Sequence, residues 1–396
     1  MRALLLSLLL GGAAAGQGTE ARVEEAVQRG ARFLLGRFDA DEGWGGARGT
    51  GVYGGVGLAY PYAAGPSALC CFALLKAGVP RDDPVLKKAF SYLKLKHRNP
   101  GVAYEISVLL LAVAERGGAS RSPDYRRATF RPDRSSNRYR LPKGSPLDRE
   151  SWTWMCELAQ KLLHFQGGSG GWRYYPMDFH SGGTADVSST QFALLALSTA
   201  SRCGFDIKPE VFRKAGTFLL AQQQEAGPRV PRAIHVAGAE EAWDRARGFP
   251  YIARSMVPAY QRVSGGMTAA GLASLLLVRE ELAAEGRDEK LEQGVLDAFA
   301  WLGRYFTVAV NPGYQPFSLG SYHFCWLYAL ERSGDLMGRE VIGERSWFTE
   351  GARHLLALQN RDGAFVDPTC MQPQDSLGTA FALLFLTRAS RPVSGG

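Results

Sequence analysis

Two residues capable of acid–base chemistry lie close together in the stretch YYPMDFHSGG, residues 174–183. Asp178 and His180 are separated by one residue, and a carboxylate beside an imidazole can move a proton to and from a substrate. The glycines and proline around them indicate a loop, where polar residues are also common for no catalytic reason. The sequence leaves both interpretations open.

Four more residues of this kind stand at the start of apolar, helix-like segments: Glu105, Asp186, His323 and Asp375. A carboxylate at a helix start is also what an N-cap requires, worth about 1 kcal/mol. Asp186 and Asp375 therefore have a capping interpretation beside a catalytic one. Glu105 and His323 fit a cap less well, so they carry more of the functional expectation.

Two kinds of helical segment alternate along the chain and must position these residues. The amphipathic kind covers residues 23–38, 84–96, 151–165, 209–224, 290–306 and 347–359. The more apolar kind covers residues 67–77, 104–115, 188–200, 268–278, 322–331 and 379–387. A helix that is apolar on all sides is a buried helix. We therefore predict about six outer–inner helical hairpins, almost no β-structure, and closure into an all-α toroid, since an open array would need polar end repeats.

A glycine-rich motif follows the amphipathic segments. Gln166, Gly170 and Trp172 fit the pattern QxxxGxW, and residues 359–365 fit it with phenylalanine in place of tryptophan. Gly43 and Trp44 keep only its end, and Gln223 with Gly227 only its beginning. An amide can satisfy backbone groups at a helix end, a glycine can supply a positive φ there, and an aromatic ring can cover both. We interpret the motif as a structural staple.

On these motifs the chain resembles the prenyltransferase/squalene-oxidase-repeat proteins of the terpenoid cyclase and protein prenyltransferase superfamily, in an exported member of bacterial type. The resemblance spans most of the chain and implies an α6/α6 toroid. It also implies that the N-termini of the inner helices rim the mouth of a central cavity. The candidate catalytic residues are then Glu105, Asp186, His323 and Asp375, with Asp178 and His180 nearby. The candidate ligand-binding residues are Trp172, Tyr174, Tyr175, Thr268 and Tyr322.

The catalytic motifs of that superfamily are missing from the sequence. Its class II cyclases protonate an alkene with a DxDD aspartate, and the nearest string here, residues 39–42, reads DADE. Its protein prenyltransferases hold zinc with Asp, Cys and His. His323 matches the histidine, but the Asp-x-Cys pair is absent, and one histidine cannot supply the three ligands of a catalytic zinc. We expect no metal and no cofactor, and we interpret His323 as a polar residue lining the cavity.

The N-terminus predicts export. Arg2 precedes an apolar run and the small residues Ala13 to Ala15, as in a signal peptide, and the run is too short to span a bilayer and anchor. We assign residues 1–16 to the signal, 17–390 to the toroid domain and 391–396 to a disordered tail, and expect a periplasmic or secreted protein. Six cysteines are compatible with disulfides there, but their apolar surroundings favour buried free thiols.

The net charge of +8 does not indicate a nucleic-acid partner. Much of the excess lies in residues 121–144, part of an insertion at 117–149 between the second and third hairpins. Its Arg, Ser and Pro content is typical of an extended, solvated segment. Peripheral contact of this insertion with an anionic surface stays open.

Three functions remain. The protein could bind a hydrophobic or isoprenoid small molecule, or a protein partner, in its central cavity. It could be a terpenoid cyclase or another isoprenoid-processing enzyme, which requires an aromatic-lined cavity with a buried acid. It could be a polysaccharide hydrolase or lyase, which requires two carboxylates about 5–9 Å apart. The missing motifs favour binding.

Overall fold

The computed structural model describes residues 2–44, 64–119, 141, 142, 145, 147–175, 185–233, 243–315, 318, 320–370 and 375–389, with side chains from residue 20 onward. In this part of the chain, outer and inner α-helices alternate as the sequence predicts. The outer helices are α1 (Arg2–Arg37), α3 (Pro84–His97), α5 (Arg149–Phe165), α7 (Pro209–Gln222), α9 (Glu289–Arg304) and α11 (Trp347–Leu358). The inner helices are α2 (Ala64–Lys76), α4 (Ala103–Gly117), α6 (Val187–Arg202), α8 (Gly265–Glu281), α10 (His323–Met337) and α12 (Asp375–Leu386).

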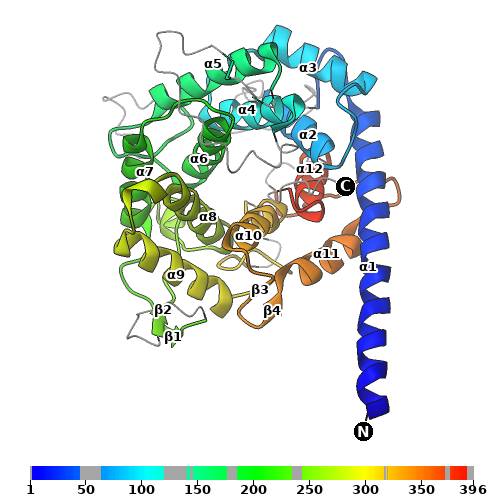
Figure 1. Ribbon diagram of the computed structural model, residues 1–396, viewed down its shortest axis with the longest axis vertical. Helices are drawn as coiled ribbons and strands as arrows, with labels where there is room; N and C mark the ends of the chain where they lie inside the picture. The colour runs from blue at the N-terminus through cyan, green and yellow to red at the C-terminus, as the bar shows by residue number, and fades with distance from the viewer. Residues whose placement is uncertain are drawn as a thin grey trace.

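The inner helices form a closed ring. Each contacts the next in the order α2, α4, α6, α8, α10, α12, and α12 contacts α2 again. Figure 1 shows the outer helices arranged around this ring. The outer layer also closes, because the end of α11 bonds to α1. Gln359 Nε2 donates to the Ala26 carbonyl at 2.9 Å, and Arg29 donates to the Asn360 carbonyl at 2.6 Å. The predicted α/α toroid is confirmed.

Burial follows the two kinds of sequence segment. Every residue of α2 from Ala64 to Leu75 is buried. In α9 the buried residues include Leu291, Val295 and Leu302, whereas Glu289 and Lys290 are exposed. Each large apolar side chain removed from water contributes about 1.5–3 kcal/mol, so the inner ring is the main source of stability.

The glycine-rich motif pins the start of an inner helix to the end of the preceding outer helix. The backbone N–H of the motif aromatic donates to a hydroxyl on the inner helix. The pairs are Trp44 with Ser67 (3.2 Å), Trp172 with Thr190 (3.0 Å) and Phe365 with Thr379 (2.9 Å). The indoles of Trp44 and Trp172 each donate to an outer-helix carbonyl, of Leu34 and Leu162 respectively, at 2.7 Å.

The motif glutamine joins neighbouring hairpins. Gln166 Nε2 donates to the Gly170 carbonyl at 2.8 Å and to the Val211 carbonyl of the next outer helix at 2.9 Å. Gln359 repeats this pair of contacts with Gly363 and Ala26. One amide thus bonds a carbonyl of its own loop and a carbonyl of the next outer helix, which is the pair of contacts that a structural staple requires.

One copy of the motif is interrupted, which corrects its assignment to Gln223 and Gly227. Gln223 Nε2 donates to the carbonyls of Arg247 and Gly294, and the N–H of Phe249 donates to Thr268 Oγ1 at 3.1 Å. The second half of this motif is therefore Gly248–Phe249. Between the halves lies a hairpin of β1 (Arg229–Pro231) and β2 (Trp243–Arg245), paired antiparallel.

Only short elements add to the helices in the described residues. They are β3 (Val341–Ile342), β4 (Arg345–Ser346) and the 3₁₀ turns η3 (Pro258–Gln261) and η4 (Ala283–Glu285). All six cysteines are free, four of them buried, as expected. Most of the 117–149 insertion and the 391–396 tail lie outside the described residues.

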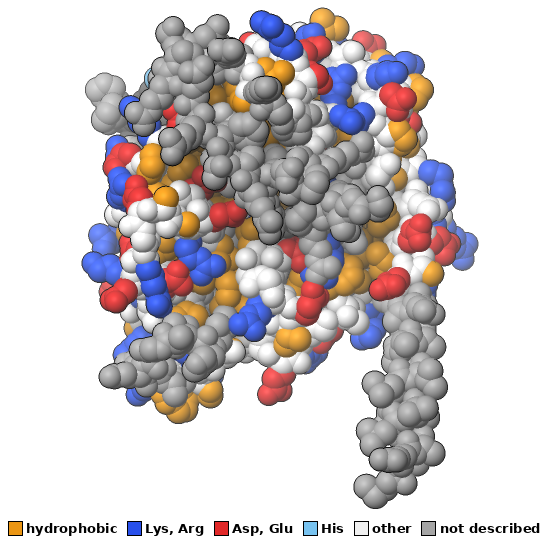
Figure 2. All heavy atoms as spheres, viewed as in Figure 1, with side chains coloured by type: hydrophobic (Ala, Val, Ile, Leu, Met, Phe, Trp, Pro, Cys, Tyr) orange, Lys and Arg blue, Asp and Glu red, His pale blue; other side chains and the backbone are white. Residues whose placement is uncertain are grey.

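The first helix is longer than the expected 23–38 segment, and its N-terminal part projects from the ring in Figure 1. Within the described part of the chain, none of the helices is both long and apolar enough to span a bilayer. Figure 2 shows basic and acidic side chains interspersed over the described surface of one face, without a block of one sign there.

Candidate functional site

The N-termini of the inner helices define a mouth at one end of the ring. Each inner helix follows an outer helix in a hairpin, so all six inner helices run in the same direction. In five of the inner helices, a residue in the first or second turn is partly exposed, whereas most residues deeper in the same helices are buried. These partly exposed residues are Tyr104, Ser188, Met267, Cys325 and Leu377.

Glu105 lies at this mouth, and it caps a neighbouring helix. Its Oε1 accepts the backbone N–H groups of Ala64 and Gly65 at 2.9 and 3.1 Å, which are the first residues of α2. Burial raises the pKa of this carboxyl, and the two backbone hydrogen bonds oppose that rise. We expected Glu105 to fit a cap poorly, and that expectation was wrong. Glu105 belongs to α4 and caps the N-terminus of the neighbouring helix α2, not the N-terminus of its own helix.

Asp186 is the N-cap of its own helix, α6, as the capping interpretation predicts. Its carboxylate accepts the Ser189 N–H at 2.6 Å and the Ser189 hydroxyl at 3.0 Å, and it is fully buried. Burial raises its pKa to about 6, against the opposing effects of the Ser189 bonds, Arg173 and the Tyr251 hydroxyl. Asp186 is thus a buried acid held by several donors.

Three more inner helices have comparable partners at their N-termini. The Gly266 N–H of α8 donates to Asn311 Oδ1 at 2.8 Å, and the Phe324 N–H of α10 donates to Asp367 Oδ2 at 2.9 Å. The Ala103 N–H of α4 donates to the Tyr174 carbonyl at 2.8 Å. The polar ring at the mouth is therefore, in large part, a capping network that satisfies unpaired helix N–H groups.

Two expected ligand-binding residues have structural roles. Trp172 is fully buried, with its indole bonded to Leu162. Thr268 is also fully buried, and its hydroxyl donates to the Ser264 carbonyl while it accepts the Phe249 N–H. Neither side chain has a polar atom left for a ligand, so both assignments are corrected.

His323 does not line the cavity. Its Nε2 lies 2.8 Å from the Val308 carbonyl, which can only accept, so Nε2 carries the proton. Its ring packs against His354 of the outer helix α11, with ring centroids 5.0 Å apart. Burial lowers the pKa of His323, opposed by the Val308 bond and Asp367. The cavity-lining interpretation of His323 is corrected, because these contacts turn its ring toward the outer layer.

The His323–His354 contact predicts loss of stability in acid. Burial, and then His323, lower the pKa of His354 to about 4, and its Nε2 is buried without a hydrogen-bond partner. The unfolded chain titrates near 6.5, so the stabilisation is complete above pH 6.5 and is lost as pH falls toward 4. Between those pH values the free energy of unfolding of the wild type should fall by on the order of 1–3 kcal/mol. His354→Leu should lack this fall, and urea unfolding of both proteins measures it. Parallel pH curves for the two proteins would contradict this.

The other expected residues are spread along the mouth. Asp375 is the first residue of α12, and its carbonyl accepts the Thr379 hydroxyl at 2.6 Å. Tyr174, Tyr175 and Tyr322 are 37%, 51% and 44% exposed. Tyr174 and Asp186 both affect the pKa of Tyr251, so they share one cluster. Asp178 and His180 lie outside the described residues.

Below the mouth, aromatic side chains of neighbouring inner helices pack in pairs. Tyr104 of α4 meets Phe192 of α6 edge to face, with centroids 4.8 Å apart. Tyr328 of α10 packs against Phe381 of α12 at 5.9 Å. Burial raises the pKa of Tyr104, and electrostatic interaction with Cys325 and Tyr328 of α10 raises it further. These groups are therefore close to Tyr104, although α4 and α10 lie on opposite sides of the ring. We call the interior of the helix ring beside these aromatic residues the lumen.

A buried cation reaches across the lumen. Arg332 of α10 donates from Nη2 to Gln191 Oε1 of α6, passing the intervening helix α8. Its guanidinium lies over the ring of Tyr328 at 4.2 Å and near that of Phe192 at 5.3 Å. Arg332 is 2% exposed and Gln191 4% exposed. The sequence prediction missed Arg332 because the expected inner helix ended at Glu331, and the signal was an arginine seven residues after Cys325 on the same helix face.

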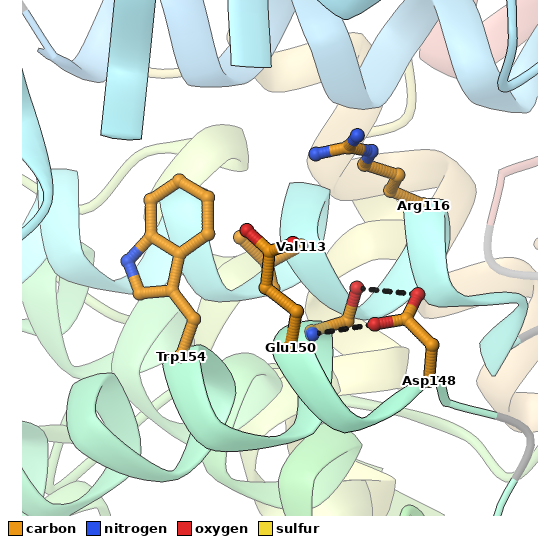
Figure 3. A pocket seen from close by; sticks show the side chains of 6 residues that line it. Val113, Arg116, Asp148, Glu150 and Trp154 are labelled. Atoms are coloured by element: carbon orange, nitrogen blue, oxygen red, sulfur yellow. Dashed lines mark hydrogen bonds between the residues drawn. The ribbon is translucent and has the colours of Figure 1, made fainter. Parts of the chain in front are cut away.

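A small pocket lies outside the ring, between the end of α4 and the start of α5 (Figure 3). It has a volume of about 100 Å³ and is lined by Val113, Arg116, Asp148, Glu150, Ser151 and Trp154. Asp148 is engaged as the N-cap of α5. Ligand sites are usually about 300–1,000 Å³, so this pocket is not our candidate. Among the described residues, no three His, Cys, Asp or Glu side chains cluster as metal ligands.

Comparison with known proteins identifies the fold. No protein-family model and no curated protein matches the chain. A similar solved structure is the type II terpene cyclase MstE from Scytonema, as a variant in complex with its product merosterolic acid A. The similarity has a TM-score of 0.51 and covers 94% of this chain and 99% of that chain, at 12% identity. The chain therefore has the toroid fold of a type II terpene cyclase.

Proposed function

We propose that the protein binds an apolar, isoprenoid-like small molecule in the lumen and does not cyclise it. The observation that carries the proposal is that the aromatic residues and the buried carboxylates of the site have different roles. Aromatic rings line the lumen, whereas the buried carboxylates of Glu105 and Asp186 at its mouth are occupied as helix caps.

The aromatic lining supports an apolar ligand. Tyr104 and Phe381 remain partly exposed within an otherwise buried wall. Such rings offer a large apolar surface at fixed positions. The similar terpene cyclase structure contains a terpenoid product, which supports an isoprenoid as the ligand class here.

The cation in the lumen argues against cyclisation. Terpenoid cyclisation passes through carbocations, and the guanidinium of Arg332 is a cation. At about 6 Å and an effective dielectric constant of 20, two unit charges repel by roughly 3 kcal/mol. A carbocation near Tyr328 would be destabilised by the guanidinium that lies over that ring.

The polysaccharide alternative is not favoured. Glu105 and Asp186 are 3% and 0% exposed, and each accepts backbone N–H groups. A glycosidic bond needs two carboxyl groups that reach the substrate. Protein partners and contact between the 121–144 insertion and an anionic surface remain secondary proposals that rest on sequence.

We propose export as well. Among the described side chains of α1, burial begins at Ala26, so the buried contacts that the structure describes for α1 lie after residues 1–16. The mass of the protein recovered from the periplasm or medium should correspond to a chain starting at residue 17. Recovery of the full-length chain in the cytoplasm alone would contradict export.

Calorimetric titration with farnesol tests the binding proposal. We expect saturable binding by the wild type and at least tenfold weaker binding by Phe381→Ala, equivalent to about 1.4 kcal/mol. Tyr305→Ala is the matched control, because Tyr305 is 42% exposed and lies at the end of the outer helix α9. Absence of binding, or equal losses in both variants, would contradict a site in the lumen.

A further inference from the structure

We propose that Arg332 and Gln191 hold the carboxylate of an apolar carboxylic acid bound in the lumen. This inference rests on the proposed function and specifies the ligand's head group. It follows from two buried donors that lack partners, from their position among aromatic rings, and from the charge available to them.

Two hydrogen-bond donors remain unpaired at the contact between Arg332 and Gln191. Arg332 Nη1 and Gln191 Nε2 are both buried without a hydrogen-bond partner, although Arg332 Nη2 and Gln191 Oε1 bond to each other. Buried polar atoms of this kind are rare and costly. None of the ion pairs among the described residues involves Arg332, whose guanidinium also forms a hydrogen bond with the Tyr328 hydroxyl. We therefore expect the partner of these two donors to be an acceptor that carries negative charge.

The guanidinium points toward the mouth. Helical side chains lean toward the N-terminus of their helix, and Arg332 accordingly stacks on Tyr328, one turn nearer the start of α10. The Cα of Arg332 lies roughly 13 Å along α10, whereas that of Gln191 lies roughly 6 Å along α6. The arginine spans this difference in depth, which puts both donors at the inner end of the aromatic lumen.

The charge balance selects a single negative charge. Arg332 supplies one positive charge, and the amide of Gln191 supplies a neutral donor. A carboxylate has two oxygens and one charge, so it can accept from both donors and leave no net charge buried. A diphosphate would bring excess negative charge into a site with one cation, beside the acidic Glu331 of the same helix and below the carboxylates of Glu105, Asp186 and Asp367.

The contact between Arg332 and Gln191 predicts an effect on stability. A buried cation without a counter-ion is destabilising, and an apolar residue of similar length removes that cost. Arg332→Met should therefore raise the Tm of the ligand-free protein while it removes the preference for an acid. A purely structural arginine would give the opposite change in Tm.

The test is calorimetric titration of the full chain with farnesoic acid, farnesol and farnesyl diphosphate, which differ in their head groups. We expect the wild type to bind farnesoic acid at least tenfold more tightly than farnesol, with the diphosphate weaker than the acid. Arg332→Met should bind acid and alcohol equally. Gln191→Leu, which keeps the cation, should lose part of the preference. Arg304→Met removes an exposed arginine of α9 and should change nothing.

The outcomes separate this inference from the proposed function. Equal binding of acid and alcohol by the wild type, or an acid preference that survives in both lumen variants, overturns the carboxylate site and leaves the binding function standing. Tightest binding of the diphosphate overturns the assignment of a single charge. Binding of none of the three compounds overturns the proposed function itself.

Discussion

Replacing Gly170 by alanine is expected to lower the free energy of unfolding by about 2–5 kcal/mol. Gly170 has a φ of +94°, and a Cβ there would lie 2.2 Å from the backbone carbonyl oxygen of Lys214 in α7. A left-handed alanine costs about 1–2 kcal/mol, and the clash with a helix backbone adds to that cost. The change would also displace the Gly170 carbonyl from Gln166, which loosens the staple between α5 and α7.

Gly168 provides the matched control in the same loop. A Cβ at Gly168 meets nothing within 4 Å, and its backbone does not have a positive φ. Gly168→Ala should leave stability unchanged or raise it by about 0.4–1 kcal/mol through the unfolded chain. Urea unfolding of both variants measures the difference. Equal effects of the two substitutions would contradict the structural role of Gly170.

Substitutions of Asp186 are expected to separate capping from catalysis. Asp186→Ala removes an N-cap and leaves the buried Ser189 N–H unpaired, a loss of about 2–4 kcal/mol. Asp186→Asn keeps an oxygen for the same N–H, so the fold and the binding of farnesol should be retained. Loss of binding or of any turnover in a stably folded Asp186→Asn would assign this residue a chemical role instead.

The pH dependence of Asp186→Asn follows from the raised pKa. The folded carboxyl titrates near 6 and the unfolded one near 3.8. Its contribution to stability is therefore complete below pH 4 and is lost as pH rises through 6, by about 3 kcal/mol. The asparagine variant lacks this loss. Relative to the wild type, it should become more stable between pH 4 and pH 7, and urea unfolding at both values measures the change.

The toroid could be predicted from sequence because each hairpin repeats the same local contacts. The amphipathic and apolar segments correspond to outer and inner helices, and Gln166, Gly170 and Trp172 make the contacts that the motif chemistry requires. The copy that begins at Gln223 was misassigned because the β1–β2 hairpin separates its halves. Only a spatial contact, from Phe249 to Thr268, reveals where that copy ends.

The candidate site was harder to predict, because the roles of its residues depend on packing between helices. Helix starts indicated the mouth, but Glu105 caps a different helix and His323 turns to the outer layer. Arg332 and Gln191 lie far apart in the sequence and meet only because α6 and α10 flank α8. Their missing partners are visible only once burial is known.

The central claim is that the lumen binds an isoprenoid without chemical change. The most direct measurement is incubation of the purified protein with isotopically labelled squalene and farnesol, followed by mass analysis of everything recovered. We predict that the labelled compound that the protein binds is recovered unchanged after many hours. A labelled cyclised product that accumulates with time and with protein concentration would contradict the claim.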